Sequence, residues 1–199
     1  MGKTLAVSPL APASFPELPV ISGVRFASAE AGVRYKNRTD VMLAVLAPGS
    51  TVAGVFTRSA TRSAPVLDCQ SKLAAGGGAS DAGAAILVNS GNSNAFTGRN
   101  GVESTRAVTT AAAQALGIEE TRVFSSSTGV IGEPLPHDRI TAKMAELTGA
   151  LDPGGIAAAA RAIMTTDTYP KGAAAEVSVG GQVVKIAGIA KGSGMIAPD

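Results

Sequence analysis

The chain has 199 residues, of which 45% are hydrophobic and 16% are charged. This balance predicts a folded domain and excludes an intrinsically disordered protein. Seventeen basic and fifteen acidic residues leave a net charge of +2, with neither a basic run nor an interleaved aromatic stretch, so nucleic-acid binding is unsupported. Aromatic residues contribute only 4%, which predicts a core of small aliphatic side chains and favours a layered α/β fold over a β-sandwich.

The N-terminal segment differs from a signal peptide. Four prolines interrupt the apolar stretch within residues 1–19, whereas a signal peptide has a continuous apolar core. The longest uncharged strand-like run, Val41–Ala47, is far too short to cross a bilayer. Cys69 is the single cysteine, which excludes an internal disulfide and favours a small, buried hydrophobic role. We therefore expect a cytoplasmic protein without a membrane contact.

The first half of the chain shows strand signals separated by turn residues. Val41–Ala47 and Thr51–Thr57 flank a Pro-Gly-Ser turn, and this pattern predicts a β-hairpin. Pro65–Gln70 is a candidate third strand. The short apolar run Ala84–Asn89 is typical of a central strand, and it carries the polar segment Asn89–Asn94 to a strand end.

Helical signals take over at Asn100. This residue is a candidate N-cap, Glu103 stands three residues later as in a capping box, and an apolar stripe ends at Gly117. Arg122–Ser126 then predicts a strand, and Thr128–Gly132 predicts the loop after it. Strand, loop and helix in this order are typical of α/β enzymes.

The last third predicts two helices and a second hairpin. The helices are expected at His137–Leu147 and Ile156–Met164. Ala173–Val179 and Gln182–Ile189 flank a Gly-Gly pair and predict the hairpin. It leads into the glycine-rich segment Lys191–Asp199. No repeat or low-complexity linker separates these parts, so the sequence predicts no internal domain boundary.

Four polar segments are candidates for chemistry. Asn89–Asn94 could orient a small polar substrate, or could simply form turns. Ser125–Gly129 sets a hydroxyl beside a glycine N–H, two donors that could converge on one oxygen; such residues are also common in turns. Thr165–Lys171 combines three threonine hydroxyls, a carboxylate and an ammonium, which suits a zwitterionic amino acid or a solvated helix end. Lys191–Gly194 offers a close-approach backbone and a cation.

Other catalytic arrangements are absent from the sequence. His137 is the only histidine and is expected at the surface, so neither a metal-ligand spacing nor a Ser-His-Asp triad is present. A dinucleotide fingerprint and a P-loop are missing too. The residues therefore predict an oxyanion hole and substrate contacts without a nucleophile or base.

Four segments together resemble one family, the arginine-biosynthesis ornithine acetyltransferases, also called glutamate N-acetyltransferases. The segments are Asn89–Ala95, Ser127–Gly132, Ile163–Thr168 and Gly188–Ile196, in the family's order and approximate spacing. The resemblance extends from about Val20 to the last residue. It implies an α/β fold, a layered sandwich with β-sheets between helices, which the related self-cleaving aminopeptidases share.

Family members cleave themselves before a threonine, and the two fragments stay together. By this resemblance residues 1–199 are a single α fragment, the major part of the N-terminal domain of the precursor. The cut would follow shortly after the end of this chain, and the nucleophilic threonine would begin the separate β chain. The implied assembly is an α2β2 heterotetramer.

The resemblance also assigns residues to the site. Thr128 and Gly129 match the oxyanion-hole pair, and Thr165 and Lys191 match substrate-binding positions, whereas Asn89–Asn94 receives no defined role. The implied reaction is ping-pong: the β-chain threonine, with its own amine as base, takes the acetyl group of N-acetylornithine and passes it to glutamate. No metal or organic cofactor is implied, although some members also accept acetyl-CoA as a substrate.

Two other functions remain open at this point. The first is the α fragment of a related self-cleaving aminopeptidase, which would hydrolyse amino-acid amides. The second is a non-enzymatic module that binds an anion with its glycine-rich loops. Acetyl transfer from N-acetylornithine to glutamate distinguishes the acetyltransferase from both.

Overall fold

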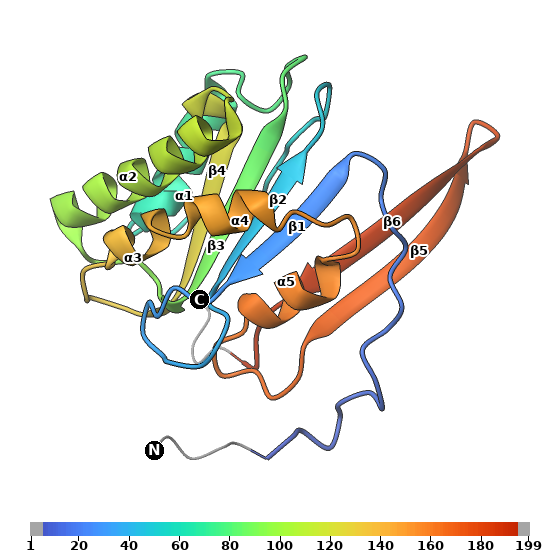
Figure 1. Cartoon of the computed structure of the whole chain (residues 1–199), viewed down its shortest axis with the longest axis horizontal. Coiled ribbons are helices and arrows are strands. Elements are labelled where there is room, and N and C mark those ends of the chain that lie inside the picture. Colours follow the sequence, from blue (N-terminus) through green and yellow to red (C-terminus); the bar gives the residue numbers. More distant parts are fainter. Residues whose placement is uncertain (1–5, 195–199) are drawn as a thin grey trace.

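A four-stranded sheet forms the centre of the molecule (Figure 1), as described by a computed structural model for residues 6–194. The strands lie side by side in chain order: β1 (Val24–Ala29), β2 (Val41–Leu46), β3 (Ala84–Asn92) and β4 (Val123–Val130). Strands β1 and β3 are both antiparallel to β2, and β4 runs parallel to β3. A parallel pair needs a crossover, and helix α2 (Gly98–Leu116) provides it.

Helices cover both faces of this sheet. The remaining helical elements are α1 (Ala64–Ala74), the 3-10 turn η1 (Glu120–Arg122), α3 (His137–Thr141), α4 (Met144–Gly149) and α5 (Ile156–Ala162). Along β2, Val41 and Leu43 pack with α2, α3 and α4, whereas Met42 and Ala44 pack with α5. Because successive side chains of a strand point to opposite faces, β2 is buried on both sides. The predicted layered α/β fold is confirmed.

Two predictions for the first half of the chain were wrong. Thr51–Thr57 forms neither helix nor strand, because both edges of β2 already pair with β1 and β3. Pro65–Gln70 lies inside helix α1 and not in a strand, with its proline in the first helical turn. Proline is tolerated there because the first turn has no N–H partner to lose.

Several boundaries differ from the sequence prediction. Helix α2 ends at Gly117, which adopts the expected left-handed cap with φ 65°, but it begins two residues before Asn100 and has no side-chain cap. The strand predicted for Arg122–Ser126 continues as β4 through Thr128 and Gly129, which are therefore not in a loop. The helix predicted for 137–147 is two helices, because the Lys143 N–H bonds the carbonyl three residues back in a tighter turn.

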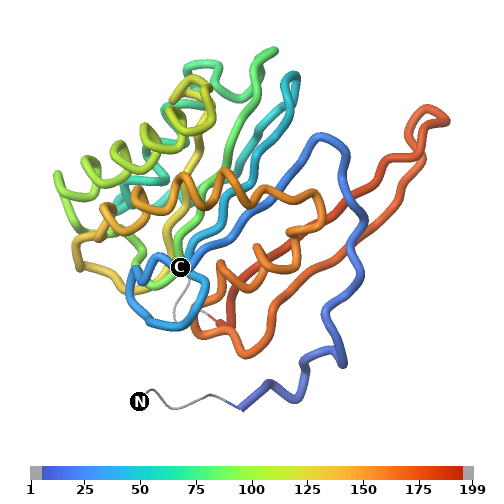
Figure 2. Tube along the Cα trace, viewed as in Figure 1, coloured from blue at the N-terminus to red at the C-terminus, as the bar shows by residue number. Residues whose placement is uncertain are grey.

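The predicted second hairpin is confirmed. Strands β5 (Lys171–Val179) and β6 (Gln182–Ala190) pair over their whole lengths and form a separate two-stranded sheet. The hairpin projects away from the central sheet, with α5 beside its base (Figure 1). The N-terminal lead runs next to it (Figure 2), and Phe15 and Leu18 lie against Gly172 at the start of β5.

Two buried groups help to join the layers. Cys69 on α1 is 6% exposed and donates to the Ser125 carbonyl on β4 at 3.2 Å, and burial raises the pKa of its thiol. The expectation of a buried cysteine is confirmed. Arg122 is 1% exposed and donates to carbonyls of surrounding loops, among them those of Gly77 and Ser50. Within residues 6–194, no helix has both the length and the apolar character that crossing a membrane requires.

Candidate functional site

The candidate oxyanion-hole residues lie near the carboxyl end of β4. Thr128 stands opposite Ser90 and Gly129 opposite Gly91 on the parallel strand β3. Carboxyl ends of parallel strands meet at one edge of a sheet, and this edge is where α/β proteins commonly bind ligands. A register shift follows at Asn92, so the two strands are irregular just where these residues lie.

Gly129 has a steric reason to be glycine. Its φ is 136°, a region that side-chain-bearing residues rarely adopt. A Cβ atom at this position would lie 2.3 Å from the Gly91 carbonyl carbon and 2.6 Å from the Asn92 nitrogen. The close approach of β3 and β4 therefore depends on the missing side chain.

The amides of Asn89–Asn94 build the frame behind this edge. Asn89 accepts a hydrogen bond from Ser127 at 2.6 Å and donates to the Asn92 carbonyl at 2.9 Å. Asn92 and Asn94 are likewise buried and hydrogen-bonded to neighbouring loop and helix groups. These contacts use the amides inside the protein, and Asn89–Asn92 belongs to strand β3, so the structure gives this segment a framework role in place of the turn expected from its residue types.

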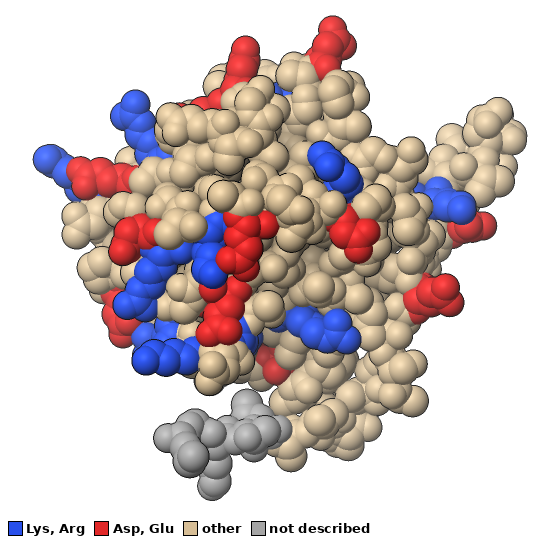
Figure 3. All heavy atoms as spheres, viewed as in Figure 1, with Lys and Arg blue, Asp and Glu red and all other residues tan. Residues whose placement is uncertain are grey.

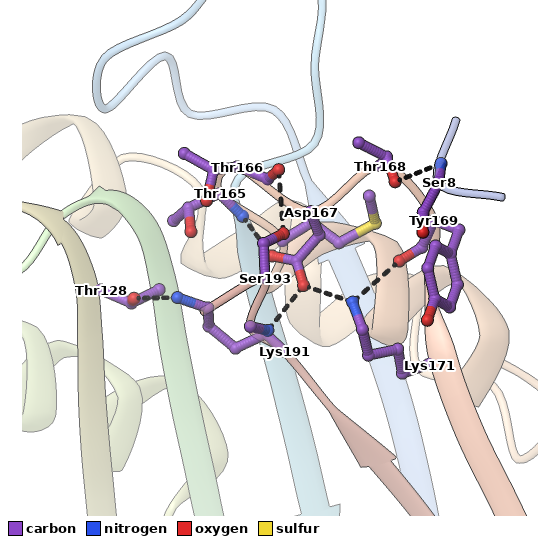
Figure 4. A network of polar contacts seen from close by, with 12 residues as sticks. Ser8, Thr128, Thr165, Thr166, Asp167, Thr168, Tyr169, Lys171, Lys191 and Ser193 are labelled. Carbon is purple, nitrogen blue, oxygen red and sulfur yellow. Dashed lines mark hydrogen bonds and ion pairs between the residues drawn. The ribbon is translucent and has the colours of Figure 1, made fainter. Parts of the chain in front are cut away.

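Lys191 reaches the oxyanion-hole candidate directly. Its Nζ donates to Thr128 Oγ1 at 2.8 Å, although 63 residues separate the two in sequence (Figure 4). Lys191 is exposed and Thr128 is half-buried. The pair presents a cation and a hydroxyl at one surface, which suits a carboxylate or a developing oxyanion.

Asp167 joins the other candidate segments. Its Oδ1 accepts from Lys171 Nζ at 2.7 Å and from the Gly192 N–H at 2.5 Å, and its Oδ2 accepts from the Thr165 N–H at 3.1 Å. Burial alone would raise the pKa of this carboxyl. The hydrogen bonds from Lys171, Gly192 and Thr165 outweigh that effect and lower the pKa from 3.8 to about 2. Asp167 is therefore an anion at every physiological pH.

Two further side chains fix the loop that carries Thr165. Arg38 donates to the Thr165 carbonyl at 3.2 Å and also to the Met164 carbonyl. Ser193 donates to the Thr166 carbonyl at 3.1 Å. All four predicted site residues thus belong to one connected set: Thr128 with Gly129 on β4, Lys191 after β6, and Thr165 after α5.

Sequence reasoning missed Arg38 and the connecting role of Asp167. Asp167 belonged to a candidate cluster, but nothing in its local sequence indicates that the Gly192 N–H lies beside it. Arg38 stands in a polar loop between β1 and β2, far from every motif in sequence. No spacing rule could have identified it.

The lone histidine lies apart from this set. His137 Nδ1 is 3.0 Å from the Ser104 hydroxyl, and the residue is half-buried at the start of α3, not fully on the surface as expected. Across residues 6–194, no three His, Cys, Asp or Glu side chains are grouped so that they could hold a metal ion.

Acidic and basic side chains are interspersed over the face shown in Figure 3.

Comparison with known proteins identifies the family to which the chain is similar. The model of the ArgJ family matches residues 25–199. The arginine biosynthesis bifunctional protein ArgJ of Ruegeria pomeroyi is 68% identical over 199 residues, all of this chain and 48% of that protein. The protein of the same name from Bradyrhizobium diazoefficiens is 54% identical over 98% of this chain and 46% of its own length.

Two solved structures share the fold. The crystal structure of the ArgJ protein of Bacillus halodurans has a TM-score of 0.79 and 34% identity, covering 89% of this chain and 91% of that one. The ornithine acetyltransferase of Mycobacterium tuberculosis complexed with ornithine has a TM-score of 0.77 and 35% identity, covering 89% and 92%. The chain thus spans about half the length of the curated relatives it matches, but 91% and 92% of the two solved chains.

Proposed function

The chain belongs to the ArgJ family, and we propose that it is the α chain of an acetyltransferase that moves the acetyl group of N-acetylornithine to glutamate in arginine biosynthesis. The observation that carries the proposal is the 2.8 Å hydrogen bond from Lys191 to Thr128. It joins a substrate-binding candidate to an oxyanion-hole candidate. The M. tuberculosis relative, solved with ornithine, supports the same substrate class.

The lysine contact prepares Thr128 to donate. A threonine hydroxyl has one hydrogen to donate and two lone pairs that accept. Because one lone pair of Thr128 accepts from the Lys191 ammonium, its own hydrogen is directed elsewhere, and the cation polarises the O–H bond. A developing oxyanion beside β4 would receive this hydrogen. Together with the Gly129 N–H, each donor would contribute about 3 kcal/mol to stabilising the transition state.

We assign the nucleophile to a second chain. The proposed threonine begins the β chain of the same precursor, and its amine removes the hydroxyl proton as it attacks the acetyl carbonyl. Ornithine leaves with that proton, and glutamate then takes the acetyl group from the threonine ester. The solved chains that match this chain over 91% and 92% of their own lengths support an α chain of this size in relatives.

The β5–β6 hairpin supports a partner chain. Ile189 packs with α5, and the alternation of β-strand side chains sets Val184 and Ile186 on the opposite face. Val177 is paired with Val184 and shares that face. Val177 is 44% exposed, Val184 is 42% exposed and Ile186 is 51% exposed. An apolar sheet face of this kind is typical of a protein interface.

We propose that the β chain covers this hairpin face. The curated relatives are about twice as long as this chain, so the remaining half of the precursor is the partner of matching length. Two such αβ units would form the α2β2 heterotetramer. A cytoplasmic location is proposed as well, on the basis of the single cysteine.

The test is a transfer assay on the protein expressed from the full-length gene. Labelled N-acetylornithine and unlabelled glutamate should yield labelled acetylglutamate and free ornithine. Hydrolysis of amino-acid amides without acetyl transfer would instead support the aminopeptidase alternative. Ornithine binding with no turnover of any substrate would support the anion-binding module. Because the relatives are named bifunctional, the assay should include acetyl-CoA as a second donor.

A further inference from the structure

We propose that Asp167 is a positioning residue that sets Lys191 and Thr165 against the amino-acid substrate by holding the backbone of both segments. The inference rests on the proposed function, which assigns substrate contacts to those two residues. Asp167 itself touches neither Thr128 nor any group assigned to the reacting atoms. Its effect on catalysis is therefore transmitted through the two segments that it holds.

The two carboxylate oxygens divide the task. Oδ2 accepts from the Thr165 N–H at 3.1 Å, and Oδ1 accepts from the Gly192 N–H at 2.5 Å (Figure 4). Gly192 directly follows Lys191, so this bond fixes the peptide group from which the lysine side chain extends. One planar carboxylate thus sets the spacing between two segments of the chain, because Gly192 lies 25 residues after Asp167 in sequence.

Burial makes this arrangement rigid. The Asp167 side chain is 0% exposed, and its ion-pair partner Lys171 is 27% exposed. A buried carboxylate keeps its charge only with compensating partners. Lys171 supplies the counter-charge from the start of β5 and is held over the Tyr169 ring at 4.3 Å. The two backbone donors complete the set, so water is not needed at either oxygen.

The chain at Gly192 depends on an outside contact. Gly192 has φ 139°, and a Cβ atom there would meet nothing within 4 Å. A side chain at this position would therefore find open space, and the backbone N–H of Gly192 is held by its hydrogen bond to Asp167, beside the bond from Ser193 to the Thr166 carbonyl. From there Lys191 extends to Thr128. Loss of the bond should release the lysine from Thr128 and from the substrate together.

Both amino-acid substrates should respond in the same way. N-acetylornithine and glutamate occupy the same site in turn in a ping-pong reaction, so both would use Lys191 and Thr165. Displacing these two residues should raise KM for both substrates by a similar factor, about tenfold or more. A general loss of folded enzyme would lower kcat and leave both KM values unchanged.

The test variant is Asp167→Asn in the full-length enzyme. An asparagine amide keeps one acceptor oxygen, while its NH2 group opposes one of the present N–H donors. Hydrogen–deuterium exchange by mass spectrometry should be measured over residues 164–171 and 188–194, beside KM for both substrates. Asp152→Asn is the matched control, because Asp152 is exposed and accepts the Gly154 N–H at 3.0 Å in a turn outside the site.

We expect Asp167→Asn to raise both KM values and to speed exchange in both segments, with Asp152→Asn unchanged. Asp167→Asn with KM and exchange within about twofold of the control would overturn the proposal. A wild-type enzyme without acetyl transfer, in which Asp167→Asn still speeds exchange, would refute the proposed function while the positioning of the two segments stands. If Asp167→Asn does not fold, Asp167→Glu serves instead, because it keeps the charge beside Lys171 but moves both oxygens away from the Thr165 and Gly192 N–H groups, and unchanged KM and exchange in it would equally overturn the proposal.

Discussion

A Cβ atom on Gly129 would lie 2.3 Å from the carbonyl carbon of Gly91 on the neighbouring strand. Gly129→Ala must therefore separate β3 from β4 and also adopt a φ of 136°. We expect the free energy of unfolding to fall by about 3 kcal/mol from the combined strain and overpacking. Urea denaturation measures this loss.

Gly132 offers a matched control for that prediction. Its φ of 84° is also positive, but a Cβ atom there would meet nothing within 4 Å. Gly132→Ala should cost about 1 kcal/mol, the backbone strain alone. Equal losses in the two variants would show that the approach of Gly91 is not what excludes a side chain from Gly129.

Thr128→Ala should lower kcat about a hundredfold, because it removes a hydroxyl aimed at the developing oxyanion, worth about 3 kcal/mol. Thr128→Ser keeps the hydroxyl and should retain most of the activity. The measurement is steady-state acetyl transfer with both substrates saturating. If serine and alanine reduce kcat equally, the hydroxyl is not the group that matters.

The same assay tests whether Lys191 acts through Thr128. Lys191→Met should raise KM and also lower kcat, because the lysine both contacts substrate and polarises the Thr128 hydroxyl. When Lys191→Met is combined with Thr128→Ala, the fold-loss of kcat should be smaller than the product of the two single fold-losses, as expected for residues that act as a unit. Lys185→Met on the exposed part of β6 is the control and should be neutral.

The lowered pKa of Asp167 should make part of the free energy of unfolding sensitive to acid. Its pKa is about 2 in the folded protein against an ordinary 3.8, so the unfolded chain takes up the proton first as pH falls. This difference in pKa contributes about 2 kcal/mol to the free energy of unfolding at neutral pH. The contribution is fully present above pH 3.8 and is lost as the pH falls through about 2.

Urea denaturation between pH 5 and pH 2 checks this component in wild type and in Asp167→Asn. The wild type should lose about 2 kcal/mol more than the variant over that range. The variant has no carboxyl at this position to titrate. If the free energy of unfolding falls equally with pH in the two proteins, the hydrogen bonds to Asp167 do not lower its pKa as described.

The hairpin face predicts a selective effect on chain association. Val184→Asp places a charge on the proposed β-chain interface, whereas Val183→Asp places it on the opposite face of the same strand, where Val183 is 67% exposed. Affinity purification through a tag on the α chain, in increasing urea, should lose the β chain earlier with Val184→Asp. Loss at the same urea concentration in both variants would argue against this face as the interface.

Local patterns predicted the elements whose signals are complete within the element. The run Ala84–Asn89, the cap at Gly117 and the Gly-Gly hairpin were predicted from neighbouring residues, and all three are present. Thr51–Thr57 has strand-like residues as well, but pairing depends on a free sheet edge. Both edges of β2 are occupied, and no local pattern carries that information.

The site illustrates the same limit. Ser125–Gly129 and Thr165–Lys171 were candidates because their residue types suit chemistry, but spacing alone could not bring them together. The contact from Lys191 to Thr128 and the bond from Gly192 to Asp167 arise because the chain that follows β6 passes both β4 and the segment after α5. Only the family resemblance indicated this convergence in advance.

Mass spectrometry can detect the proposed acetyl-threonine intermediate itself. The wild-type complex is mixed with N-acetylornithine in the absence of glutamate, and its chains are then separated and weighed. We predict one acetyl group on the threonine that begins the second chain, discharged when glutamate is added, and formed much more slowly in Thr128→Ala. Acetyl transfer without any acetylated chain would rule out the acetyl-threonine intermediate, and acetylation at the same rate in Thr128→Ala would rule out Thr128 as an oxyanion donor.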